Sequence, residues 1–220
     1  MSKVNWKERM TGWFKRKDAI KIPEMFARIK QKELVPGDII LFYHGNKLTE
    51  AHGEWMRSKK YGHVSNAPYH AAIVYDLTIS GETIILDPEL TTSFSPLTEY
   101  TLKEGQRIDI IRYPATDERR KAIRNTILEI AEKEGMYDAK GYGAFIAQLP
   151  FMGWVKKIIR PSNKTWFCSD AVTYAVEHNG IKVSEMDNNN TAPVDLLIYG
   201  LENYDLYTLK TRGEHDEDTR

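Results

Sequence analysis

The sequence predicts an α+β fold in which most strands precede the helices. Two observations carry this prediction. Short apolar runs bounded by turn residues cluster in the first half of the 220-residue chain, and amphipathic helical patterns follow them. This order is typical of α+β domains and not of alternating α/β folds. The length fits one substantial domain with an appended segment.

Short apolar segments of the first half have the character of strands. They are bounded by glycine, proline or polar residues, as strands commonly are. The predicted strands cover residues 38–43, 70–75, 83–87 and 107–113, with a further short strand at 205–209. Ser80-Gly81 is a turn signal between the second and third strands, so these two are expected to form a hairpin.

The hydrophobic period changes after the fourth strand. Apolar residues at helical spacing between 122 and 131 predict a helix that starts near Asp117 and stops at Gly135. A second helix is predicted to open at Cys168 and to end at Gly180, a residue type favoured just after a helix. Residues 136–161, rich in glycine, aromatics and proline, predict no regular element.

Composition narrows the classes of function. The chain has 31 basic and 31 acidic residues, so its average charge does not indicate nucleic acid or another polyanion as a partner. No apolar run is long enough to span a bilayer. The N-terminus has no apolar signal region, and the expected location is the cytoplasm, where a free thiol persists. The sequence does not indicate an oligomeric state.

The two ends differ in charge. Lysine and arginine are frequent in the first 22 residues and are interleaved, near one helical stripe, with Trp6, Met10, Trp13 and Phe14. We expect residues 1–30 to form a helix peripheral to a domain that begins at Val35. This helix either packs its tryptophan face on the domain or contacts an anionic membrane or a partner protein. The acidic residues 211–220 are expected to be disordered.

Cys168 is the only cysteine in the chain. A single cysteine forms no intrachain disulfide and no paired-cysteine metal site. At the start of a helix, free N–H groups and the positive end of the helix dipole favour a thiolate. The residue is therefore either a nucleophile or a small apolar side chain that fills the core.

A cysteine nucleophile needs a base, and the base needs an orienting group. His70 begins an apolar strand, which places its ring at the end of a sheet, and Asp87 ends the strand expected beside it. Neighbouring strands are about 5 Å apart, so the two side chains can meet if they share a face. Glu89 is the alternative acid. His63 is a competing histidine, ranked second because no apolar strand follows it.

The order of these motifs resembles the permuted NlpC/P60 group of papain-like cysteine hydrolases, in its YiiX-like branch. The matching stretches are a Gly-Asp before an apolar run (35–41), a histidine strand (69–74), an acid followed by Pro-Leu (86–97), a Tyr-Asp pair (135–138), a Cys-Ser helix start (166–172) and a Pro-x-Asp-Leu segment (191–196). In unpermuted relatives the cysteine helix comes first. The third residue is usually Glu in this branch, where this chain has Asp87.

The resemblance implies a permuted papain-like domain over residues 35–210. It implies an antiparallel sheet packed against the helix that bears the nucleophile, and an inserted segment at 136–161 near the site. Cys168, His70 and Asp87 would form the triad, with the N–H of Cys168 and a group near Tyr137 holding the oxyanion. The implied substrates are cell-wall peptides, or lipid-linked acyl or amide groups. Neither a cofactor nor a metal is implied.

Three other interpretations stay open. The first is a catalytically silent binding or structural module on the same fold. The second is a lipid acyltransferase like the lecithin-retinol acyltransferase group, although residues 167–170 do not match that group's Asn-Cys-Glu-His type of motif. The third is a metal site built from His44, His52, His63 and His70, whose spacing matches no common ligand pattern.

Overall fold

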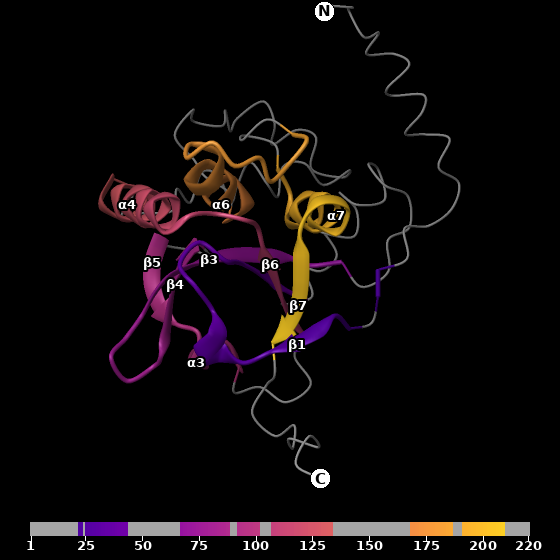
Figure 1. The fold of residues 1–220 in the computed structure, drawn as a ribbon, viewed down its shortest axis with the longest axis horizontal. Coiled ribbons are helices and arrows are strands. Elements are labelled where there is room, and N and C mark those ends of the chain that lie inside the picture. The colour runs from indigo at the N-terminus through magenta and orange to yellow at the C-terminus, as the bar shows by residue number, and fades with distance from the viewer. Residues whose placement is uncertain are drawn as a thin grey trace, which may run out of the picture.

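The computed structural model describes seven stretches of the chain. They are residues 22–23, 25–43, 67–88, 92–101, 107–133, 168–186 and 191–209. Within them the fold is α+β, as the sequence predicts, with one seven-stranded sheet and three longer helices (Figure 1).

The sheet has the order β1-β7-β6-β2-β3-β4-β5. Its strands are β1 (Ala27–Ile29), β2 (Ile39–Phe42), β3 (His70–Leu77), β4 (Thr83–Pro88), β5 (Thr92–Pro96), β6 (Ile108–Arg112) and β7 (Asp205–Leu209). All neighbouring pairs are antiparallel except β1 and β7, which run parallel. The expectation of a purely antiparallel sheet is therefore corrected, because an N-terminal strand adds to the sheet in the same direction as the C-terminal one.

The central strands follow directly from their apolar runs. All four residues of β2 are buried, as are the first five of β3. Continuous burial means that both faces of these strands are covered, which explains why the sequence shows runs and not alternation. The expected hairpin between β3 and β4 is present, and Gly81 in its turn has a positive φ of 80°.

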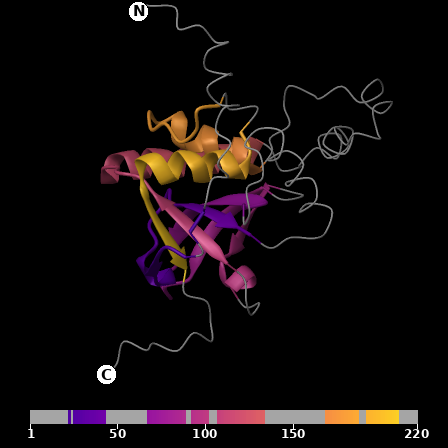
Figure 2. The same ribbon diagram turned by 90° about the vertical axis from the view of Figure 1, so that its right-hand side faces the viewer.

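Helices α4 (Asp117–Lys133), α6 (Cys168–Glu177) and α7 (Pro193–Asn203) form a layer on one face of the sheet (Figure 2). Their apolar side chains pack on the odd-numbered residues of β2 and β3 in one core cluster, which includes Ile39, Ile73, Ile127, Val172 and Leu197. No helix within the described residues is long and apolar enough to cross a bilayer.

The other face of the sheet encloses a second core cluster. Its buried members come from strands at both sides of the sheet, including Ile29 of β1, Leu209 of β7, Ile85 of β4 and Leu97 after β5. Seven strands spaced about 4.8 Å apart could not bring these residues together if the sheet were flat. The sheet is therefore strongly curled around this cluster, as Figure 1 shows.

The boundary expected at Val35 is wrong as a limit of the core. Residues 27–29 are a strand of the sheet and not part of a helix. Ile22 packs in the first core cluster, and Ile29 and Leu34 pack in the second. The chain before Val35 thus completes the sheet edge beside β7. The remaining residues of the expected helix, 1–21 and 24, lie outside the described residues, as does the tail 211–220.

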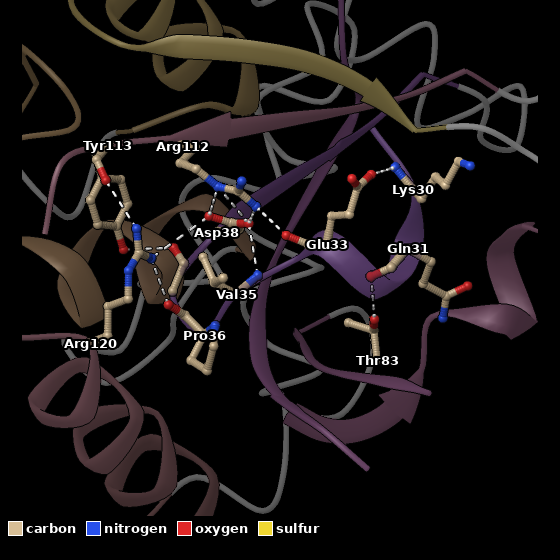
Figure 3. Close-up of polar contacts among 11 residues, drawn as sticks. Lys30, Gln31, Glu33, Val35, Pro36, Asp38, Thr83, Arg112, Tyr113 and Arg120 are labelled. Atoms are coloured by element: carbon tan, nitrogen blue, oxygen red, sulfur yellow. Dashed lines mark hydrogen bonds and ion pairs between the residues drawn. The ribbon is translucent and has the colours of Figure 1, made fainter. Parts of the chain in front are cut away.

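The Gly-Asp motif forms a buried polar cluster at the entry to β2 (Figure 3). Asp38 accepts hydrogen bonds from the backbone N–H of Val35 at 3.0 Å and from the Arg112 guanidinium at 3.1 Å. Arg120 lies 3.8 Å from the same carboxylate. Burial raises the pKa of Asp38, and the hydrogen bond with Arg112 opposes that rise. Asp38 therefore ties β2, β6 and α4 together and has a structural role.

Candidate active site

His70 is the first residue of β3 and is buried. It lies opposite Phe42 in the pairing of β3 with β2. The two rings stack with centroids 5.5 Å apart and an interplanar angle of 26°. The imidazole is therefore held at the end of the sheet by an aromatic neighbour from the adjacent strand.

Asp87 reaches His70 from the neighbouring strand. The register pairs Ile73 with Leu86, and one further step places Asp87 opposite Ala72. Because side chains alternate between faces, Asp87 and His70 share a face as diagonal neighbours. Oδ1 of Asp87 lies 2.6 Å from Nε2 of His70, so the contact expected between these two residues is present.

Pro88 does not prevent this arrangement. It is the last residue of β4 and pairs with Thr92 of β5. Asp87 is therefore inside the strand and is 3% exposed, so it is not a turn residue facing solvent. The alternative acid, Glu89, lies outside the described residues.

Tyr100 is a further contact of Asp87 that the sequence did not indicate. It belongs to α3 (Thr98–Thr101), and its hydroxyl donates a hydrogen bond to Oδ2 of Asp87. The two carboxylate oxygens thus have separate partners, the His70 ring and the Tyr100 hydroxyl. No local pattern around Tyr100 could have revealed this contact, because it depends on how the chain folds back after β5.

Cys168 approaches His70 from the helix layer. It is the first residue of α6, which packs on β3 (Figure 1), and its thiol is free and partly exposed. The thiol lies close enough to the His70 side chain to raise the pKa of its imidazole. Since Nε2 of His70 is engaged by Asp87, Nδ1 is the ring nitrogen left for the sulfur. The structure brings the three side chains together with the imidazole in the middle.

The charges of this cluster support one another. Burial lowers the pKa of His70, but the Cys168 sulfur and the Asp87 carboxylate together raise it to about 10. Burial raises the pKa of Asp87, but His70 and the Tyr100 hydroxyl outweigh this and hold it below its ordinary value. The contacts with both neighbours therefore favour the protonated form of His70 near neutral pH.

The start of α6 is fixed by its second and third residues. Ser169 and Asp170 are both buried. The Ser169 hydroxyl donates a hydrogen bond to the carbonyl of Thr191, and the N–H of Thr191 donates to Oδ1 of Asp170 at 3.1 Å. These bonds join the first turn of α6 to Thr191, two residues before α7 begins, so Cys168 begins a helix whose position is well defined.

Several predicted site residues lie outside the described residues. They are the oxyanion candidate Tyr137, the histidines His44, His52 and His63, and the segment 136–161. Among the described residues, no group of three or more His, Cys, Asp or Glu side chains is arranged to hold a metal ion.

Comparisons with protein-family models and with curated proteins do not identify a relative. No protein-family model matches the chain, and no curated protein matches it.

Proposed function

We propose that the protein is a cysteine hydrolase that cleaves an amide or ester bond through Cys168, His70 and Asp87. One observation supports this most strongly. His70 contacts both the free thiol at a helix start and a buried carboxylate, although the three residues come from three separate elements. Nucleophilic catalysis by a cysteine needs a base within reach of the thiol and a third group that orients the base.

The first half of the reaction forms an acyl-enzyme. Nδ1 of His70 takes the thiol proton, and Asp87 stabilises the imidazolium through Nε2. The thiolate attacks the substrate carbonyl carbon and gives a tetrahedral oxyanion. The carbon–nitrogen or carbon–oxygen bond then breaks, the leaving amine or alcohol receives the proton from His70, and a thioester remains on Cys168.

The second half releases the acid. His70 takes a proton from water, and the resulting hydroxide attacks the thioester carbon. The second tetrahedral oxyanion collapses, the carbon–sulfur bond breaks, and the sulfur leaves as a thiolate beside the imidazolium. In both halves the backbone N–H of Cys168, at the start of α6, is the proposed donor to the oxyanion. Tyr137 stays the proposed second contributor.

The resemblance to permuted NlpC/P60 hydrolases agrees with this proposal. It explains the chain order of histidine, acid and cysteine. On this proposal the α+β fold is a permuted papain-like core. The proposed substrates are cell-wall peptides or lipid-linked acyl or amide groups.

The first experiment measures the reactivity of Cys168. Because the chain has one cysteine, the mass increase after iodoacetamide treatment reports this thiol alone. We expect the wild-type thiol to be alkylated well below pH 8.5, the model value for a thiol, because the proposal lets His70 take its proton. His70→Ala should move the profile back toward 8.5. His178→Ala, which removes an exposed histidine stacked on Tyr174, is the matched control.

A second experiment addresses the reaction. Muropeptides and short-chain acyl esters are each mixed with excess enzyme, and the intact mass is followed for an acyl adduct. In the wild type this adduct is a thioester on Cys168, which Cys168→Ser cannot form. Hydrolysis without an added acceptor supports a hydrolase. Product formation only when a lipid alcohol or amine is supplied would show an acyltransferase instead. A wild-type thiol that titrates at 8.5 and acquires no acyl group would indicate a silent module and overturn the proposal.

A further inference from the structure

We propose that Tyr100 is a positioning residue for this site, and that its hydroxyl holds Asp87 in the orientation that serves His70. The inference rests on the proposed function and deepens it. The working group would then comprise four side chains, of which Cys168 and His70 react, Asp87 orients the imidazole, and Tyr100 fixes Asp87.

The two oxygens of the Asp87 carboxylate have separate partners. Oδ1 of Asp87 is 2.6 Å from Nε2 of His70, and Oδ2 accepts the hydroxyl proton of Tyr100. A terminal carboxylate rotates readily when only one of its oxygens is held. With both oxygens engaged by groups from different elements, rotation would break two hydrogen bonds in a buried setting, where an unsatisfied oxygen is costly.

The turn that carries Tyr100 is itself held by hydrogen bonds. Leu97, three residues before it, is completely buried and donates its N–H to the carbonyl of Thr83 at 2.9 Å. The N–H of Tyr100 donates to the carbonyl of Leu97 at 3.0 Å. The Thr98 hydroxyl donates to Glu82 at 2.7 Å. The turn that carries Tyr100 is thus attached to the start of β4, the strand that also carries Asp87.

His70 and Tyr100 share an aromatic neighbour, Phe42. Phe42 stacks on His70 at 5.5 Å, and it also contacts the Tyr100 ring at 4.9 Å with a 45° tilt. Phe42 therefore sets the spacing between the ring that reacts and the ring that holds the acid. Because this packing uses the Tyr100 ring and not its hydroxyl, Tyr100→Phe removes the hydrogen bond while it keeps the packing.

Tyr100 also affects the ionisation of Asp87. Asp87 must stay ionised to stabilise the imidazolium, and burial works against this. The groups that lower the pKa of Asp87 are His70 and Tyr100. When His70 passes its Nδ1 proton to the leaving group, it keeps the Nε2–H bond to Asp87 but loses its positive charge. The Tyr100 hydroxyl bears no formal charge at neutral pH, so it keeps the carboxylate ionised at each stage of the reaction.

The test combines two measurements on the full chain. The carbon-13 shift of the Asp87 carboxyl gives its pKa, which should rise in Tyr100→Phe because a donor to the ionised form is lost. Iodoacetamide alkylation of Cys168 at pH 6 should slow by about tenfold, the size expected for one hydrogen bond to a charged group. Tyr75→Phe is the matched control, since Tyr75 lies on the same sheet against Phe94 and Arg124. It should change neither quantity.

A double-mutant cycle separates positioning from general structural support. If Tyr100 acts through Asp87, Tyr100→Phe should have no further effect on alkylation in an Asp87→Asn background. An equal slowing in both backgrounds would overturn the inference, as would an unchanged pKa of Asp87 in Tyr100→Phe. These outcomes differ from a failure of the proposed function, in which the wild-type thiol itself is not activated. In that case an unchanged carboxyl pKa in Tyr100→Phe would also exclude the link between the two residues, whereas a raised pKa would reduce the role of Tyr100 to fixing Asp87 without catalysis.

Discussion

Nε2 of His70 lies 2.6 Å from Oδ1 of Asp87, and the two residues are 17 positions apart in the chain. Both are buried at the end of neighbouring strands, on the face where Phe42 and Tyr100 also pack. Water competes weakly for a contact in this environment, so the carboxylate acts strongly on the imidazole. This relationship makes the site sensitive to single substitutions of the acid.

Replacement of Asp87 by asparagine should lower the pKa of His70. The substitution removes the negative charge next to Nε2 but leaves the burial that disfavours the imidazolium. Alkylation of Cys168 between pH 6 and 7 should therefore slow by at least about tenfold. The control is Asp76→Asn. Asp76 lies on the same strand as His70, and its partly exposed carboxylate pairs with Arg124. Equal reactivity of the two variants would exclude Asp87 as the orienting group.

The stability of the protein should also depend on pH through His70. Its pKa is raised to about 10 in the folded state, whereas an unfolded histidine titrates near 6.5. The contribution of His70 to the free energy of unfolding is therefore fully present below pH 6.5 and is lost as the pH rises toward 10. The expected slope is at most about 1.4 kcal/mol per pH unit.

The difference in urea-unfolding free energy between the wild type and His70→Gln reports the titration of His70 together with that of Cys168, because the proposed proton transfer couples the two groups. An unfolded thiol keeps its proton up to about pH 8.5, and this proton balances the one that the folded imidazole holds. The difference should therefore shrink mainly between about pH 8.5 and 10. A constant difference up to pH 10 would mean that the folded state does not hold the imidazole proton.

Much of the sheet and of the site could be predicted from the sequence. The apolar runs gave β2, β3, β4 and β6 because both faces of those strands are buried. Asp87 could be expected near His70 because the two residues lie at the ends of neighbouring strands, but their shared face depends on the register of β3 and β4. The helix that opens at Cys168 followed from its apolar spacing and from Gly180, whose φ is 77°.

Other elements left weaker signals. Strand β5 is an edge strand made largely of threonine and serine, and β1 has three residues whose parallel partner is about 180 positions away. Neither is marked by an apolar run. Helix α7 was not predicted, although Pro193 in its first turn and Asp195, which accepts the N–H of Ala192 at 2.7 Å, mark a helix start. The role of Tyr100 depends on tertiary packing and had no sequence signature.

The contribution of residues before Val35 to the core can be measured directly. Leu34 is 2% exposed and packs in the second core cluster. Leu34→Ala should therefore lower the free energy of unfolding by about 2–5 kcal/mol, because it removes buried methyl groups and leaves a cavity. Lys32→Ala, two residues earlier and exposed, should change it by less than about 0.5 kcal/mol. A similar small effect at both positions in urea unfolding would restore the domain boundary at Val35.

The turn at Pro36-Gly37 offers a comparison between two glycines of similar backbone conformation. Gly37 has a φ of 90° and Gly180 a φ of 77°, so alanine is strained at both by about 1–2 kcal/mol. At Gly180 a new Cβ meets open space, whereas at Gly37 it would lie 2.8 Å from the Tyr113 hydroxyl oxygen. That hydroxyl donates to the carbonyl of Gly37 at 2.6 Å and is buried.

Gly37→Ala should therefore cost more than Gly180→Ala, by roughly a further 1–3 kcal/mol for the displaced and unsatisfied hydroxyl. Urea unfolding of the two variants measures the difference. In a Tyr113→Phe background the clash and the lost hydrogen bond are both absent, so the extra cost at Gly37 should shrink toward the value at Gly180. If the two glycines respond equally in the native background, the contact between Tyr113 and the turn does not constrain the entry to β2.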